Sequence, residues 1–319
     1  MLTAILTAWL IAAAPLPPGV SLRAETTHFR VYGSDAVATA AERLAPEAEG
    51  RLDAVCQRLG ACHVLSGKVD VFVAEDPEAF AASLPPGSPM AEWASGVAFP
   101  AERRVVLRAH GSALFSFLQT FDHELAHVLL HGLAGGNPYP RWVTEGLAIW
   151  ASGEGLMERL ASANRAAVLG NLLPFDELDR RFPNKGPNVE IAYAQSALFV
   201  HTLVGRFGAG ALPQVLREVG RGARFDDAFE ARFGGAPDSL GDLWSRDLER
   251  DSSPLMLFQD GSAFWVLMTL LFVYAAWRQQ RDRQRQMEAM DGPEQDPAAL
   301  AAFEELETQR REGEAPTLH

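Results

Sequence analysis

Thiols and surplus positive charge are both scarce in this sequence of 319 residues. Its two cysteines are Cys56 and Cys62, which argues against a metal site built on thiolates. The formal net charge is −13, and this argues against nucleic acid as a partner, because phosphate binding needs a basic face. No internal repeat is visible. Hydrophobic residues make up 48% of the chain, enough for the core of one large domain or two modest ones.

The two cysteines lie near the end of a predicted helix over residues 36–59, with Gly60 between them. In an exported protein, a disulfide that closes this small loop fits the spacing. The alternative is a pair of small buried thiols. Spacing does not show whether the geometry suits a bridge, so the sequence leaves both readings open.

The segment His123-Glu-Leu-Ala-His127 is the centre of the functional analysis. It lies in an apolar run with helical periodicity, from about Ser112 to Leu130. Four helical residues turn the chain by about 400° and advance it by about 6 Å, so His123 and His127 share one face. Two imidazoles in this arrangement can bind one Zn²⁺ ion, and Glu124 is placed to hold a water molecule and accept its proton. The alternative is an ordinary surface helix, on which such a short pattern arises by chance.

A third ligand has to come from elsewhere, because catalytic zinc takes three protein ligands and keeps one open position. His131 lies two turns from His123, about 12 Å along the helix, so both cannot reach one ion. Glu145 is the better candidate because it lies on a second predicted helix, where Gly146 allows close approach of a neighbour. A carboxylate among apolar residues is costly to bury unless it is paired or binds a metal. The alternative is a solvated glutamate on the polar face of that helix.

These two motifs carry a family resemblance. His123-Glu-Leu-Ala-His127, followed by Pro-Arg-Trp-Val-Thr-Glu145-Gly-Leu-Ala, resembles the gluzincin branch of zinc metallopeptidases, and most closely its peptidase-MA-like family. The resemblance covers about residues 27–250. It implies one Zn²⁺ per chain with His123, His127 and Glu145 as ligands, Glu124 as the general base, and a peptide or protein as substrate.

The resemblance also points to a further catalytic residue and to one departure from the family pattern. Many gluzincins stabilise the oxyanion with a downstream Tyr or His, and the segment 191–199 resembles that helix, which makes Tyr193 the candidate. The alternative is a core aromatic residue with a satisfied hydroxyl. Some gluzincins orient a ligand histidine with an Asp four residues after the Glu ligand. Ile149 stands there in this chain, so the orienting partner is not identified from the sequence.

The pattern of elements predicts an α+β fold for a gluzincin-like domain over residues 25–252. Residues 25–110 are expected to form a small subdomain with a mixed or antiparallel sheet, and residues 111–252 a mainly helical, zincin-like catalytic subdomain. In gluzincins an edge strand ahead of the zinc helix pairs with the substrate. By resemblance, residues 96–99 or 105–107 can provide it. The alternative for each is an internal, fully paired strand, and the sequence does not decide.

Residues 1–24 begin with an apolar, uncharged run that prolines end. This run is too short to span a bilayer comfortably and fits a secretory signal peptide, although a basic start is missing. Cleavage is expected either after the alanines at 12–14 or near Ala24. The alternative is an uncleaved N-terminal anchor.

Residues 262–277 carry no charge and are followed by several arginines. They are predicted to form one C-terminal transmembrane helix, with a buried core helix as the alternative. The positive-inside bias puts the tail, residues 278–319, in the cytoplasm, and its composition predicts disorder over most of its length, with a short helix over residues 297–311 as the alternative for part of it. The catalytic domain is then expected in the periplasm or outside the cell, held by a single pass in a bacterial inner (plasma) membrane.

The function predicted from the sequence is therefore a membrane-anchored zinc metallopeptidase. The alternative is a scaffold or assembly protein of the cell envelope that binds metal or peptide without cleaving it. An intact Glu124 favours the enzyme, since a binding protein has no use for a base at that place. The sequence indicates neither an oligomeric state nor a particular substrate.

Overall fold

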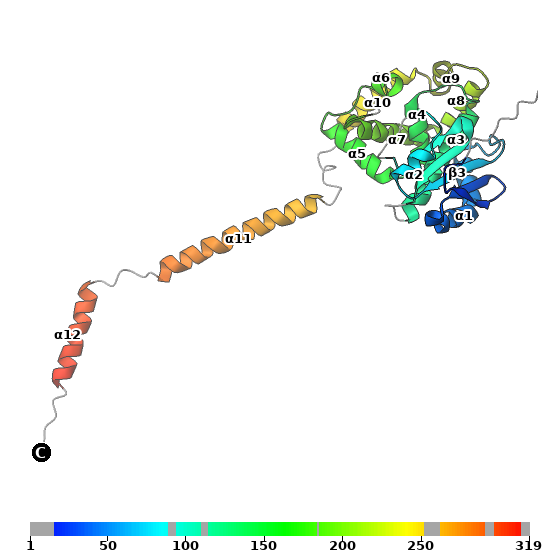
Figure 1. The fold of residues 1–319 in the computed structure, drawn as a ribbon. Coiled ribbons are helices and arrows are strands. Elements are labelled where there is room, and N and C mark those ends of the chain that lie inside the picture. The colour runs from blue at the N-terminus through cyan, green and yellow to red at the C-terminus, as the bar shows by residue number, and fades with distance from the viewer. Residues whose placement is uncertain are drawn as a thin grey trace, which may run out of the picture. The chain divides into compact units, whose positions relative to one another are not determined.

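A computed structural model describes residues 16–88, 94–109, 114–183, 185–251, 262–290 and 297–313. The chain divides into two compact units, Met1–Met256 and Leu257–His319. Figure 1 shows the strands of the first unit in blue and cyan near α1, with the later helices in green and yellow beside them, and the second unit as helices without a sheet among its described residues. The functions assigned above to the parts of the chain stay predictions.

The described residues of the first unit form a five-stranded sheet in the order β1-β2-β3-β5-β4. The three central strands run parallel to one another, and β1 and β4 pair antiparallel at the two edges. The strands are β1 (Ser21–Glu25), β2 (Phe29–Gly33), β3 (Val69–Ala74), β4 (Gly96–Phe99) and β5 (Arg104–Arg108). This mixed sheet, followed by a mainly helical part, confirms the predicted α+β class.

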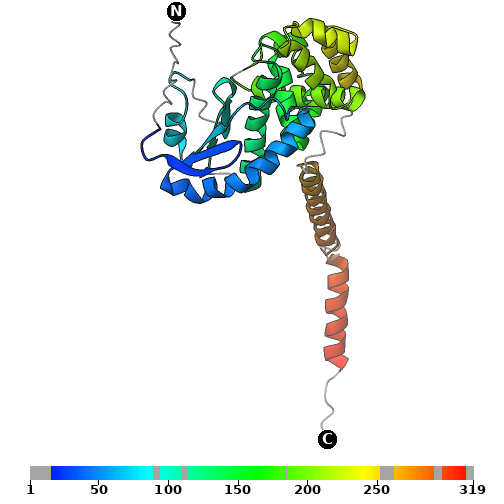
Figure 2. The same cartoon turned by 90° about the vertical axis from the view of Figure 1, so that its right-hand side faces the viewer.

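The sheet buries one face against two long helices, α1 (Ala38–Leu59) and α3 (Leu114–Leu133). Figure 2 shows α1 in blue alongside the strands. Side chains alternate between the faces of a strand, so Phe29 and Val31 enter this core together and are fully buried. The ring of Phe29 meets that of Phe121 edge to face at 5.6 Å, which joins the sheet to α3. The other face carries a smaller core with Phe80 of α2 (Pro77–Ala82).

The helical part of the first unit packs around Trp142, which is fully buried. Four phenylalanine rings lie within 6.3 Å of its ring, centroid to centroid. Its indole N–H donates to Asp179 at 3.0 Å, which satisfies the one polar atom of the side chain. The helices are α4 (Arg141–Ser152), α5 (Leu156–Val168), α6 (Phe175–Arg180), α7 (Asn188–Phe207), α8 (Ala211–Gly220), α9 (Phe225–Phe233) and α10 (Pro237–Asp251).

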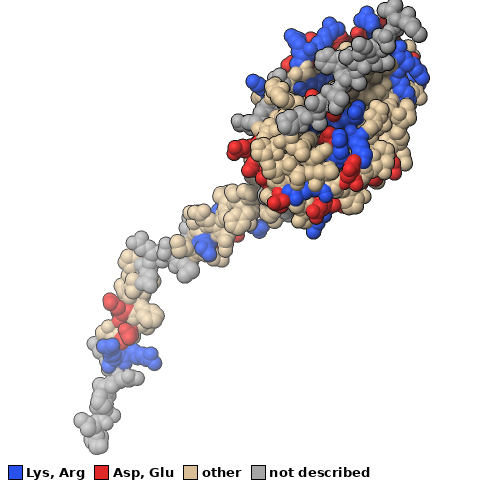
Figure 3. Space-filling view, turned by 45° about the vertical axis from the view of Figure 1, so that its right-hand side comes forward, with Lys and Arg blue, Asp and Glu red and all other residues tan. Residues whose placement is uncertain are grey.

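The surface of the first unit carries charges of both signs, which are interspersed in the view of Figure 3. Several form ion pairs, such as Arg23 with Asp35 at 2.6 Å and Lys68 with Glu25 at 2.7 Å. An exposed pair of this kind contributes only about 0–1 kcal/mol. The stability of the unit therefore depends mainly on its two apolar cores.

Cys56 and Cys62 form a disulfide at the end of α1. Gly60 lies between them and ends the helix in the left-handed region, with φ of 60°. The structure therefore contains the first of the two alternatives that the spacing left open.

The predicted signal peptide falls largely on residues 1–15, which lie outside the described residues. Ala24 belongs to β1, where it pairs with Val31 of β2. Cleavage near Ala24 would remove most of this edge strand, whereas cleavage after residue 14 would leave it intact. The signal peptide itself stays a prediction.

The second unit requires a correction to the sequence analysis. Its described residues form α11 (Ser262–Met290) and α12 (Pro297–Gly313), and none of the described helices has the length and apolar character needed to cross a membrane. The uncharged part of α11 is about 24 Å long, short of the ~30 Å hydrocarbon core, and the same helix continues into charged residues from Arg278. The predicted transmembrane helix over residues 262–277 is therefore not supported. The described residues of the tail are helical, and α12 matches the alternative of a short helix over residues 297–311. The disorder of the tail stays a prediction.

The tight crossing of α4 and α7 gives a first testable prediction. A Cβ added to Gly146 would lie 2.5 Å from Cγ2 of Val200 and 2.6 Å from the carbonyl oxygen of Ser196. Backbone atoms cannot give way cheaply, so we expect Gly146→Ala to lower the free energy of unfolding by about 1–3 kcal/mol. Urea unfolding followed by circular dichroism measures this change.

Gly205→Ala is the matched control on α7. An added Cβ there meets nothing within 4 Å, so this substitution should be neutral or stabilise the helix by up to about 1 kcal/mol. Equal losses of unfolding free energy in both variants would contradict the close approach of α7 to Gly146.

Candidate metal centre

His123, His127 and Glu145 meet where α3 and α4 pack together. One ligand atom from each lies within 4.8 Å of the others. Nε2 of His123 and Nε2 of His127 are each 3.6 Å from Oε2 of Glu145. The two imidazole rings stand nearly perpendicular, at 79°, as expected for residues one helical turn apart that turn toward a common point.

These three residues fit a zinc ion. Two donors about 2.1 Å from a tetrahedral ion lie about 3.4 Å apart, close to the 3.6 Å between each histidine and Glu145. Glu145 is 5% exposed, so the alternative of a solvated glutamate is wrong. Two imidazoles and one carboxylate are a donor set that zinc accepts with one position left for water or substrate. His131 is not part of the cluster, as its position two turns along the helix predicts.

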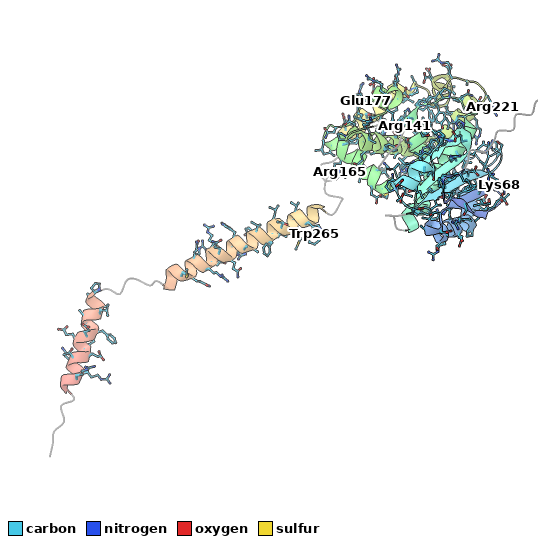
Figure 4. All side chains as sticks on the ribbon, viewed as in Figure 1. Lys68, Arg141, Arg165, Glu177, Arg221 and Trp265 are labelled. Carbon is cyan, nitrogen blue, oxygen red and sulfur yellow. A yellow bond between two sulfur atoms is a disulfide. The ribbon has the colours of Figure 1, made fainter. Side chains whose placement is uncertain are left out.

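The second oxygen of Glu145 is held by two polar groups from α4 and α7. Oε1 accepts a hydrogen bond from Nε of Arg141 at 2.9 Å and one from the hydroxyl of Tyr193 at 3.2 Å. Arg141 also donates to the Tyr193 hydroxyl at 2.9 Å. Figure 4 labels Arg141 among the helices of the first unit. These contacts leave Oε2 facing the histidines, and they bring Tyr193 to the edge of the cluster, although its catalytic role stays a prediction.

Glu124 belongs to α3, and its side chain lies next to the edge strand β4. The backbone of Ala98, in this strand, lowers the pKa of Glu124 slightly against the larger effect of burial. At Gly96 an added Cβ would lie only 3.0 Å from Cγ of Glu124 and 2.7 Å from Cγ2 of Thr120, so the strand approaches the helix closely at this point. In the sheet of the described residues β4 is at the edge and β5 is internal. Of the two candidate substrate strands, residues 96–99 therefore have the free edge and residues 105–107 do not.

Burial and neighbouring charges give the four groups different proton affinities. Burial raises the pKa of Glu124 to about 8 and lowers that of His127 to about 4. Burial would also lower the pKa of His123, but contacts with Glu145 and Glu154 outweigh it and raise the value to about 10. Burial alone would raise the pKa of Glu145, yet its contacts with the histidines hold it far below the ordinary range. The site therefore favours positive charge next to Glu145, which a divalent cation supplies.

Glu154 is a polar neighbour of the cluster that the sequence analysis missed. Its Oε2 lies 3.1 Å from Nδ1 of His123, at the distance of an ion pair but without the alignment of a well-formed hydrogen bond. Its Oε1 accepts a hydrogen bond from the hydroxyl of Thr120 at 2.8 Å. Position 149, where some gluzincins carry an orienting Asp, is a fully buried isoleucine in this chain. The available signal was a lone acidic residue between Gly153 and Gly155, at the end of the predicted helix.

The cluster predicts metal binding by the purified full chain. We expect about one zinc ion per chain after dialysis, and a strong loss in Glu145→Ala because the site then keeps two ligands of three. Elemental analysis of the dialysed proteins measures the metal content. His131→Ala is the control and should keep its zinc. Full retention of zinc in Glu145→Ala would show that another residue is the third ligand.

Solved structures give low-identity matches to the fold. They include yeast LTA4 hydrolase, with a TM-score of 0.46, 13% identity, and coverage of 70% of this chain and 38% of that one. A variant of the M1 zinc metallopeptidase from Deinococcus radiodurans matches with a TM-score of 0.42, 18% identity, and coverage of 72% and 50%. An aminopeptidase N family protein from Idiomarina loihiensis gives 0.40, 12%, 76% and 46%. In each case the match spans half or less of the other protein.

A sequence search among curated proteins gives no match to this chain. The family model of the peptidase MA superfamily, in contrast, matches residues 59–249. This range covers more than half of the chain and includes both halves of the metal centre, α3 and α4. The chain belongs to the peptidase MA superfamily.

Proposed function

We propose that this protein is a zinc-dependent peptidase that hydrolyses peptide bonds. The observation that carries the proposal is the convergence of His123, His127 and Glu145 on one point, with the carboxylate of Glu124 on the adjacent residue. Membership in the peptidase MA superfamily supports the same reaction class. The chain spans half or less of the solved structures described above, so their names assign it no substrate.

His123, His127 and Glu145 would hold the zinc ion. When bound, zinc supplies Lewis-acid activation of a water molecule and of the substrate carbonyl. Glu124 accepts the proton of the attacking water and passes it to the leaving amine. Burial raises its pKa above the ordinary value of a glutamate, which makes its carboxylate a stronger base.

The free edge of β4 would hold the peptide substrate. An extended peptide can add to a sheet as a further strand, with main-chain hydrogen bonds that do not depend on its sequence. This strand passes close to Glu124 at Gly96, where an added Cβ would lie 3.0 Å from Cγ of the glutamate. A substrate paired with residues 96–99 would therefore lie next to the general base.

Tyr193 would stabilise the negative charge that develops on the carbonyl oxygen. Burial, together with the charge of Glu145, raises the pKa of its hydroxyl, so the group keeps its proton and remains a donor. Arg141 donates to the same hydroxyl and polarises it further.

We also propose that the catalytic unit works outside the cytoplasm, in the periplasm or at the cell exterior. The disulfide between Cys56 and Cys62 supports this location, since such bonds persist mainly in oxidising compartments. The apolar N-terminal run, read as a signal peptide, supports it independently.

Glu124→Gln separates the peptidase from a scaffold that only binds metal or peptide. The amide keeps the shape of the side chain but cannot accept the proton, so we expect peptide cleavage to fall about 100- to 10,000-fold. Zinc content should stay at the level of the wild type, because Glu124 is not a ligand. Cleavage is measured with a library of internally quenched fluorescent peptides. A wild-type protein that binds zinc but cleaves no peptide would favour the scaffold.

Tyr193→Phe tests the proposed donor. We expect kcat to fall about 100-fold while KM and zinc content change little, because the hydroxyl acts mainly in the transition state. Steady-state kinetics on a peptide cleaved by the wild type measures both constants. Tyr32→Phe, on β2, is the control, since it removes a half-buried hydroxyl elsewhere and should leave kcat unchanged. An unchanged kcat in Tyr193→Phe would leave its hydroxyl with a structural role only.

A further inference from the structure

We propose that Glu154 is the positioning residue that orients His123 for metal binding, in place of the acidic residue that position 149 lacks. The assignment rests on the proposed zinc site. Glu154 lies in the loop between α4 and α5, outside the two segments that carry the ligands. A residue of this loop would therefore contribute to metal affinity.

The first observation is that His123 has a carboxylate at each ring nitrogen. Nε2 lies 3.6 Å from Oε2 of Glu145, and Nδ1 lies 3.1 Å from Oε2 of Glu154. An imidazole that binds a metal through Nε2 must carry its proton on Nδ1, and a nearby acceptor fixes both this tautomer and the ring orientation. Glu154 lies at ion-pair distance from Nδ1, where a carboxylate can act as that acceptor, and its negative charge together with that of Glu145 balances a divalent ion.

The second observation is that Glu154 is itself held in place. Its Oε1 accepts from the hydroxyl of Thr120, one turn before His123 on α3, at 2.8 Å. Its backbone N–H donates to Oγ of Ser152 at 3.0 Å. The flanking Gly153 and Gly155 both have positive φ, 71° and 55°, and this double turn after α4 returns the chain to α3. An orienting group needs such fixed geometry, because a mobile carboxylate selects no ring orientation.

The third observation is that the other acidic neighbour on α3 has a different partner. Asp122 lies next to His123 in the chain, but its carboxylate accepts from Arg51 of α1 at 2.7 Å. Position 149, one turn after Glu145, is a fully buried isoleucine. Among the described residues, Glu154 is the carboxylate recorded within ion-pair distance of Nδ1.

The test is the zinc dissociation constant of the full chain, measured by competition with a chromophoric chelator. Removing an orienting partner of a ligand histidine typically weakens metal binding 10- to 100-fold, so we expect a loss of about that size in Glu154→Ala. Glu154→Gln should lose less, because its amide oxygen can still accept from Nδ1. Glu158→Gln is the matched control. It removes a negative charge from the exposed first turn of α5 and should change the constant less than about twofold.

A second readout separates orientation from folding. Nitrogen-15 NMR of the zinc-loaded protein reports the protonation of His123, and we expect a protonated, slowly exchanging Nδ1 in the wild type. In Glu154→Ala this proton should exchange faster, and the absorption bands of the cobalt-substituted protein should shift. A lower melting temperature with an unchanged dissociation constant and unchanged spectra would overturn the assignment, since Glu154 would then only join α3 to the loop. A wild type that binds no zinc would overturn the proposed function together with this assignment.

Discussion

A buried carboxylate is costly unless positive charge or hydrogen bonds compensate it, and Glu145 is such a group at the junction of three helices. The histidines of α3 face one of its oxygens, while Arg141 and Tyr193, from α4 and α7, contact the other. Removing the histidines or Arg141 would leave the charge of Glu145 less compensated in the interior. The packing of α3, α4 and α7 therefore depends on the same contacts that form the metal centre, so fold and site cannot vary independently.

The apolar core makes that arrangement possible. Trp142 anchors α4 in a cluster of aromatic rings, and Glu145 follows it by one turn, so the packing of the ring fixes where the carboxylate points. Gly146 then allows α7 to approach α4 at a distance that any side chain would prevent. This approach carries Tyr193 to Glu145. The precision of the polar site is thus set by close packing among residues that have no part in the chemistry.

One part of this site could be predicted from local sequence spacing. The rest could not, because it depends on contacts between segments that are distant in the sequence. A helix fixes the faces of His123 and His127 by itself, and the cost of burying a charge pointed to Glu145. Which strand forms the sheet edge depends on strand order, and the contact of Glu154 depends on a double turn after α4; neither has a local signature. The predicted membrane span failed for a related reason. The arginines after the uncharged run were taken as the end of a span, whereas α11 continues through them as one helix.

Three glutamates of one buried site have different chemistry because their partners differ. Glu145 faces two histidines and an arginine, which stabilise its charged form so well that its pKa lies far below the ordinary range. Glu124 is as deeply buried but has fewer positive neighbours, so burial prevails and raises its pKa. Glu154, whose pKa is also lowered, is held by Thr120 and His123. A carboxylate held in its charged form suits a metal ligand, and one whose pKa is raised by burial is a stronger base. All three residues are glutamates, so their different surroundings determine which one acts as ligand, which as base and which as orienting group.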